Sequence, residues 1–259
     1  EGLIGETPDR AGSGAIDFHG EHFTVWLSPS RLFNAMLPTP VAIDSKLPWV
    51  GTTIFTVMSK LALDCGAINL SQGFPDFQAE PALFDAMDRA MRGGRNQYAP
   101  MTGMPELRTA IAAKVQALYG TAYDVDQEVT VTAGATQAIF TAIAAFVRPG
   151  DEVIVFEPVY DSYVPAIETV GGKAVYARLR FPGYTPDWDE VRRLITPKTR
   201  MVIINSPHNP TGSLLSAADL DRLADLLDGS NIVLLSDEVY EHILFDGERH
   251  ASVAGHPAL

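Results

Sequence analysis

The sequence has almost no cysteine and comparatively little positive charge. A single cysteine, Cys65, among 259 residues excludes an intrachain disulfide framework and fits a reducing compartment. We therefore expect a cytoplasmic protein in which Cys65 is a buried structural thiol. Lys and Arg number 19 against 32 Asp and Glu, which gives a formal net charge of −13. This balance argues against nucleic acid or an anionic membrane as a partner, because both require clustered basic residues.

Long apolar runs are also missing. No window approaches the ~20 apolar residues of a membrane span, and the N-terminus lacks the basic start and apolar centre of a signal peptide. The longest apolar stretch, Ala142 to Val147 with Ala138 to Phe140 before it, predicts a buried helix. Because the chain begins with Glu1 rather than Met, we expect a processed chain or a fragment.

Two common nucleotide-binding motifs are absent. Gly12-Ser13-Gly14 is followed by Asp17, where a dinucleotide fingerprint needs glycine, and no strand pattern precedes it. No Gly-Lys-Ser/Thr phosphate-binding loop occurs anywhere in the sequence. Neither nicotinamide nor nucleoside triphosphate chemistry is therefore supported, and we expect no metal site.

The pattern of the chain changes near residue 45. Residues 1–44 carry scattered glycine and proline without sustained periodicity, so we interpret them as an extension without an assigned role. After them, strand and helix patterns alternate. Compact apolar segments predict strands at Val129–Thr132, Val153–Phe156, Met201–Asn205 and Ile232–Leu235, of which the last two should be buried.

Three of the helices between these strands have recognisable ends. The pattern from 105 to 120 begins with proline, ends with glycine and keeps its apolar residues on one face. Asp187 and Glu190 have capping-box spacing at the start of a helix that ends before Pro197. Ser216 caps a third helix with four leucines directed inward. The alternation predicts an α/β fold, a mostly parallel sheet with helices on both faces.

Polar residues gather where the predicted strands end. Ligands of such sheets bind outside the carboxyl ends of the strands, so we expect chemistry at 133–137, 157–163, 205–212 and 236–241. Small residues at 133–137 let backbone N–H groups approach a phosphate at a helix start. The second segment offers an aromatic side chain for stacking. Each segment alone also fits a structural role, a tight turn or an ordinary tyrosine, and both interpretations stay open.

The other two segments carry an amide and an acid. Asn209 is restricted by the proline that follows it, which can aim its amide at a ligand. Asp237 follows four apolar residues, so it is expected in a low-dielectric cleft where it needs a cationic partner. The alternatives for these two segments are a Pro-rich turn and a solvated acid.

In this order and spacing, the four segments together resemble the fold type I, pyridoxal-phosphate-dependent aminotransferases of class I and II. The resemblance is strongest to the methionine and kynurenine (glutamine-type) branch, and it runs from about residue 45 to residue 259. Further matches are Asn69–Phe77, Asn96–Pro100 with Gly103, and Glu241-His242. The resemblance implies pyridoxal 5′-phosphate as cofactor and exchange of an amino group between an amino acid and a 2-oxo acid.

The resemblance also implies roles around the cofactor ring. Asp237 would pair with the ring nitrogen and keep it protonated, so that the ring can accept electrons from the substrate. Asn209 and Tyr240 would hydrogen-bond the ring oxygen, and Tyr160 would stack on the ring face. Asp237 and Tyr240 are the residues that we expect to be catalytic.

Other implied contacts concern the phosphate, the substrate and the partner subunit. Ala135 and Thr136 would hold the phosphate at the helix start. Gly73, together with Asn209, would line the substrate carboxylate. Tyr98 would reach the phosphate in the neighbouring subunit, so the resemblance implies a homodimer.

The family's cofactor lysine has no counterpart here. The resemblance implies an N-terminal arm with part of a small domain at 45–75 and a cofactor-binding large domain at 76–259, incomplete at its C-terminus. In the family a Ser-x-x-Lys segment follows the strand after the Asp-x-x-Tyr motif. All five lysines of this sequence instead precede Asn209: Lys46, Lys60, Lys114, Lys173 and Lys198. We therefore expect a truncated chain that lacks most of the small domain and is inactive as printed.

Two alternative functions remain open from sequence. A cysteine-conjugate β-lyase would use the same fold and residues, and a cofactor-binding fragment without catalysis would follow from the absence of the cofactor lysine. The amino-acid donor, whether methionine, aromatic or glutamine-like, is undecided because part of the specificity region is expected in the missing small domain.

Overall fold

The computed structural model describes residues 44–73, 75 and 77–259. The predicted extension at 1–44 thus falls almost wholly outside the described residues, as do Phe74 and Asp76 of the Asn69–Phe77 match. The chain divides into two units, residues 1–45 and 46–259, and the fold below is that of the second unit.

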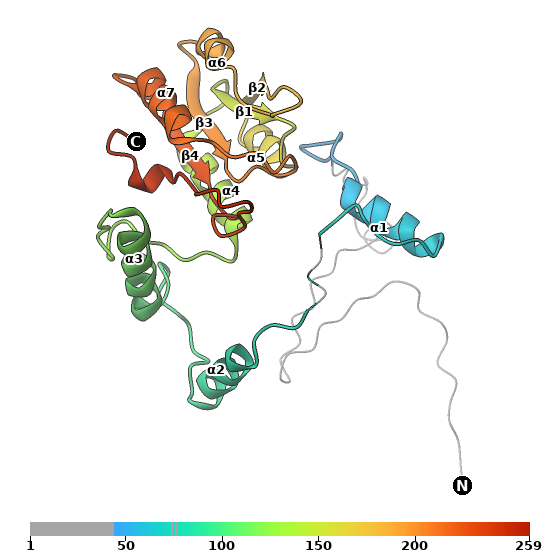
Figure 1. Cartoon of the computed structure of the whole chain (residues 1–259), viewed down its shortest axis with the longest axis vertical. Coiled ribbons are helices and arrows are strands. Elements are labelled where there is room, and N and C mark those ends of the chain that lie inside the picture. The colour runs from blue at the N-terminus through green and yellow to red at the C-terminus, as the bar shows by residue number, and fades with distance from the viewer. Residues whose placement is uncertain (1–43, 74, 76) are drawn as a thin grey trace, which may run out of the picture. The chain divides into compact units, whose positions relative to one another are not determined.

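Residues 152–237 of this unit contain a four-stranded parallel sheet (Figure 1). Its strands lie in the order β2-β1-β3-β4, and every neighbouring pair is parallel. Their bounds are β1 Glu152–Glu157, β2 Lys173–Arg178, β3 Thr199–Asn205 and β4 Val233–Asp237. The register places Asn205 opposite Asp237, so two polar side chains meet at the carboxyl edge of the sheet.

Helices cover both faces of the sheet, and a separate apolar core lies between the sheet and the helices on each face (Figure 1). Helices α4 (Ala135–Phe146) and α5 (Tyr163–Thr169) pack on one face, and α6 (Trp188–Leu194) and α7 (Ala217–Leu227) on the other. Successive side chains along a strand point to opposite faces of the sheet, so each strand contributes apolar side chains to both cores. Ile143 and Leu223, one from each core, are fully buried. The predicted α/β fold with a parallel sheet is confirmed.

Two strand predictions are confirmed and two need correction. β1 and β3 form where expected, and β3 is buried along most of its length. β4 is only half-buried from Val233 to Ser236, since it lies at the edge of the sheet with one neighbour. The predicted strand Val129–Thr132 is not a strand. Among the described residues no ladder partner pairs with it, and Val131 N–H donates only to the carbonyl of Thr102.

The predicted helix ends agree well with the structure, but the apolar face predicted for the helix at 105–120 is not buried as expected. α3 (Pro105–Tyr119) ends at Gly120, whose φ of 80° lies in the left-handed region that favours glycine. Of its predicted apolar face, Leu107 and Leu118 are exposed and the other two residues half-buried, and within the described chain α3 buries only Arg108. At α7, Ser216 and Asp219 form a full capping box. α4 buries the predicted apolar stretch only on the side that faces the sheet.

The remaining elements were not predicted individually. They are α1 (Ile54–Asp64), α2 (Pro81–Arg92), α5, β2 and a short 3-10 helix, η2 (Val253–Gly255). Neither α1 nor α2 buries a residue, and Cys65 at the end of α1 is exposed, so the prediction of a buried thiol is wrong. In the described part of the chain no helix combines the length and apolar character needed to span a bilayer.

Candidate functional site

A pocket of about 190 Å³ opens at the carboxyl ends of β3 and β4. It is lined by Ala135, Thr136, Ile139, Tyr160, Asn205, Asn209, Asp237, Val239 and Tyr240. Six of the eight site residues named from sequence line this pocket. The other two, Gly73 and Tyr98, do not line it and are exposed.

Asp237 is the buried acid of this pocket. It ends β4 and is only 9% exposed. Its Oδ2 accepts a hydrogen bond from the Tyr163 hydroxyl at 2.6 Å, and its Oδ1 accepts one from Val239 N at 3.2 Å. Within the described chain, no Lys, Arg or His forms an ion pair with it. A carboxylate removed from water in this way favours a cationic ligand.

The start of α4 presents unused backbone donors to the same pocket. Gly134 precedes the helix with φ 91°, a conformation that favours glycine, and no side chain caps the helix. A Cβ there would meet nothing within 4 Å, so backbone conformation rather than space requires glycine. The first N–H groups of a helix have no intrahelical partner and carry the positive end of its dipole. Ala135 and Thr136 in this first turn therefore favour an anion.

Tyr160 comes from the loop that follows β1. Its ring meets that of Tyr163 edge to face, with the ring centroids 5.6 Å apart. Burial, and then the neighbouring Asp161 carboxylate, raise the pKa of Tyr160, although a hydrogen bond with Thr136 opposes the rise. The phenol therefore stays protonated at neutral pH, and Tyr160 lines the pocket together with the start of α4 and Asp237.

Asn205 joins the segments that carry the other pocket residues. Its Nδ2 donates to the carbonyl oxygen of Asp237 at 2.9 Å, and its Oδ1 accepts from Asn209 N at 2.7 Å. Asn205, Ile139 and Val239 also line the pocket but were not among the site residues expected from the sequence. The available signal for Asn205 was a polar residue at the end of an otherwise apolar strand.

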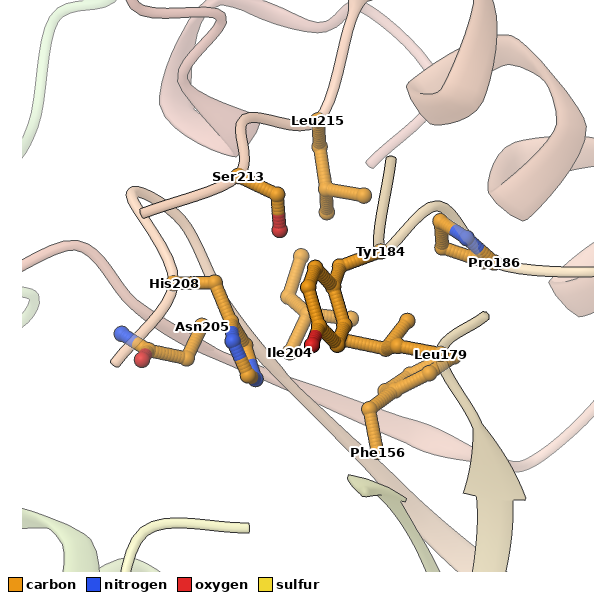
Figure 2. Close-up of a pocket in the computed structure, with 9 residues that line it drawn as sticks. All are labelled: Phe156, Leu179, Tyr184, Pro186, Ile204, Asn205, His208, Ser213 and Leu215. Carbon is orange, nitrogen blue, oxygen red and sulfur yellow. The ribbon is translucent and has the colours of Figure 1, made fainter. Parts of the chain in front are cut away.

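A second, much smaller cavity of about 20 Å³ lies behind Asn205 (Figure 2). Figure 2 shows the Tyr184 ring between His208 on one side and Leu179 on the other. His208 Nδ1 lies 2.8 Å from the Thr211 hydroxyl, and the ring also hydrogen-bonds the backbone of Pro158. Burial lowers the pKa of His208, so a neutral imidazole connects the loop after β1 to the loop after β3.

Glu238 follows Asp237 directly but serves a different purpose. It accepts hydrogen bonds from His250 Nε2 at 2.7 Å and from Ser236 Oγ at 2.8 Å, and does not line the pocket. Burial opposes its ionisation, yet the hydrogen bonds, that from His250 first, outweigh burial and lower the pKa of Glu238. Glu238 therefore anchors the chain after β4, and Asp237 is the acid that remains for a ligand.

None of the five lysines lines the pocket. Lys60 pairs with Asp64, Lys114 with Glu241 and Lys173 with Glu152. Lys46 donates to the carbonyl oxygen of Thr169, and Lys198 is exposed.

Comparison with known proteins decides the family. The model of the family "Aminotransferase class I and II" matches residues 66–259. The chain belongs to this family. It is 50% identical over 224 residues to a methionine aminotransferase of Escherichia coli strain K12, with 86% of this chain and 58% of the relative covered. It is 47% identical over 214 residues to a probable N-succinyldiaminopimelate aminotransferase of Mycobacterium tuberculosis, with 82% and 54% covered.

Solved aminotransferases also share its fold. The structure of an Escherichia coli methionine aminotransferase matches with a TM-score of 0.82 at 51% identity, covering 84% of this chain and 57% of the other. The predicted family, branch and fold are therefore confirmed, and class I and II aminotransferases depend on pyridoxal phosphate. The chain spans somewhat more than half the length of these relatives.

Proposed function

We propose that this chain supplies most of the pyridoxal phosphate site of an enzyme that transfers an amino group between an amino acid and a 2-oxo acid. The observation that carries the proposal is the environment of Asp237. This carboxylate is buried, receives two hydrogen bonds from the protein, and lines a pocket without a cationic partner among the described residues. A protonated ring nitrogen would provide the missing positive charge.

The pocket residues also fit the rest of the cofactor. The uncapped start of α4, with Ala135 and Thr136, favours the phosphate. The Tyr160 ring fits the ring face, while Asn209 and Tyr240 offer an amide and a hydroxyl for the ring oxygen. When bound, the cofactor supplies an electron sink for the substrate carbon. The residues bind and orient it, and Asp237 maintains the ring proton.

The chemistry benefits from the burial of this acid. An ion pair between Asp237 and a ring nitrogen is stronger in a low-dielectric pocket than in water. The tyrosine that holds Oδ2 and the backbone N–H that holds Oδ1 are both neutral donors, so they leave the negative charge available. Asp237 and Tyr240 are thus the proposed catalytic residues of this chain.

Substrate and assembly belong to the same proposal. The donor is proposed to be methionine or an aromatic or glutamine-like amino acid, which the methionine aminotransferase relative supports. Gly73 and Asn209 are proposed to bind the substrate carboxylate. Tyr98 is proposed to serve the partner subunit of a homodimer, supported by its full exposure away from its own pocket. The single cysteine supports a cytoplasmic location.

Replacement of the acid tests the proposed function. In a protein that contains this chain and has transaminase activity, Asp237→Ala should lower the rate of transamination on the order of 100- to 1,000-fold, since a preorganised charge is lost. It should also weaken binding of pyridoxamine 5′-phosphate, measured by isothermal titration. Asp225→Ala, on the exposed side of α7, is the matched control and should change neither quantity. Near-normal turnover and binding in Asp237→Ala would remove the acid from its proposed role.

A further inference from the structure

Tyr163 contacts the proposed catalytic acid from outside the pocket. It is the first residue of α5, is 3% exposed, and is not among the residues that line the pocket. Its hydroxyl lies 2.6 Å from Asp237 Oδ2 and joins two segments 74 positions apart in sequence. A hydrogen bond from a buried hydroxyl to an ionised carboxylate is charge-assisted and stronger than one between neutral groups.

The proton of this hydrogen bond belongs to the tyrosine. An ionised carboxylate can only accept, so the Tyr163 hydroxyl donates. Burial, and then the hydrogen bond to Asp237, raise the pKa of Tyr163 above its ordinary value. The phenol therefore keeps its proton throughout the neutral range and remains a donor to Asp237.

Two donors fix the orientation of the carboxylate. Oδ2 is held by the Tyr163 side chain from α5, and Oδ1 by the backbone N–H of Val239 after β4. A carboxylate offers about four acceptor positions. These two hydrogen bonds prevent free rotation of the group and leave acceptor positions for a ligand in the pocket. Of the two donors, only Tyr163 can be changed by substitution without altering the backbone that carries Asp237.

Tyr163 also supports the proposed stacking residue. Its ring packs edge to face on Tyr160 with an interplanar angle of 73°. This is a favourable arrangement for two aromatic rings. Tyr163 therefore touches both the acid and the aromatic residue of the pocket while remaining outside the pocket itself.

We infer that Tyr163 is a positioning residue for cofactor binding: its hydroxyl keeps the Asp237 carboxylate oriented toward the ring nitrogen, and its ring holds the Tyr160 ring in place. The inference rests on the proposed function. A tyrosine with a purely structural role would lower the stability of the fold, and its removal would weaken ligand binding equally whether or not Asp237 is present.

A double-mutant cycle separates these two roles. Tyr163→Phe, Asp237→Ala and the double variant are prepared in the intact protein, and the dissociation constant of pyridoxamine 5′-phosphate is measured by isothermal titration. Tyr163→Phe alone should weaken binding about tenfold, the size expected for a hydrogen bond to a charged group. The double variant should bind less than about twofold more weakly than Asp237→Ala alone, because the carboxylate through which Tyr163 acts is gone.

A second tyrosine provides the control. Tyr176→Phe removes a partly exposed hydroxyl on β2 and should leave the dissociation constant unchanged. Equal losses from Tyr163→Phe with and without Asp237 would overturn the positioning role. So would wild-type binding by Tyr163→Phe when Asp237→Ala alone loses affinity, and that result would leave the proposed function intact. Wild-type binding by Asp237→Ala would instead overturn the proposed function and this inference together.

Discussion

The side chain of Asn205 donates to the backbone carbonyl of Asp237 across 2.9 Å and so ties the end of β3 to the end of β4. The same amide accepts from the backbone N–H of Asn209 at 2.7 Å. Asn205 is 8% exposed, and water cannot readily replace these contacts. One buried side chain therefore sets the relative positions of two segments that line the pocket.

Asn205→Ala should lower the free energy of unfolding by about 2 kcal/mol, because it leaves the part-buried Asn209 N–H without its partner and removes one donor from the Asp237 carbonyl. Urea denaturation of the intact protein, followed by circular dichroism, measures this change. Asn231→Ala, an exposed asparagine before β4, is the control and should cost less than about 0.5 kcal/mol. Equal stability of the two variants would contradict the prediction.

His208→Asn should weaken the acid sensitivity of the fold. Burial lowers the pKa of His208 in the folded state, so the unfolded chain binds the proton more readily. The stability that the neutral imidazole contributes is fully present above the unfolded pKa of about 6.5. It is lost as pH falls from there through the lower folded pKa. The free energy of unfolding should therefore fall less steeply below pH about 6.5 in His208→Asn than in the wild type.

The measurement for His208 is a series of urea denaturation curves between pH about 7.5 and pH about 5. His242→Asn is the control, because the His242 side chain is largely exposed. It should follow the wild-type dependence on pH. If His208→Asn also follows the wild-type curve, the buried imidazole does not contribute to acid sensitivity.

The printed chain should form no stoichiometric covalent adduct with pyridoxal phosphate. None of its five lysines lines the pocket, and three are engaged by Asp64, Glu241 and Glu152. After incubation with the cofactor and borohydride reduction, peptide mass mapping should find only sparse labelling spread over several lysines. A single fully labelled lysine accompanied by transaminase turnover would show that the site uses a lysine that the structure places elsewhere.

The sequence was most informative where local chemistry and sheet geometry coincide. Asn209 and Asp237 each follow an apolar run that predicts a strand, and parallel strands bring their carboxyl ends to one edge. This geometry explains why the segments after β1, β3 and β4 line one pocket, which Ala135 and Thr136 join from the start of α4. Their assigned roles, however, depended on the family resemblance, because spacing alone does not identify a cofactor.

Features that depend on sheet order or on side-chain direction could not be predicted. Val129–Thr132 has a strand pattern, yet within the described chain it has no neighbour with which to pair. The half-exposure of β4 follows from its place at the edge, which the local pattern of Ile232–Leu235 does not reveal. The hydrogen bond of Tyr163 to Asp237 depends on how α5 leaves the sheet, and no spacing between the two residues encodes that direction.

The strand order has a consequence for synthesis on the ribosome. β2 and β3 both pair with β1, and β4 pairs with β3, so every new strand joins one that has already been translated. Translation adds about 5–20 residues per second, and Asp237 emerges a few seconds after Asn205. The nascent chain can thus place the start of α4 and the Tyr160 side chain first. Asp237 arrives with β4, and the pocket has no acid until that strand has docked.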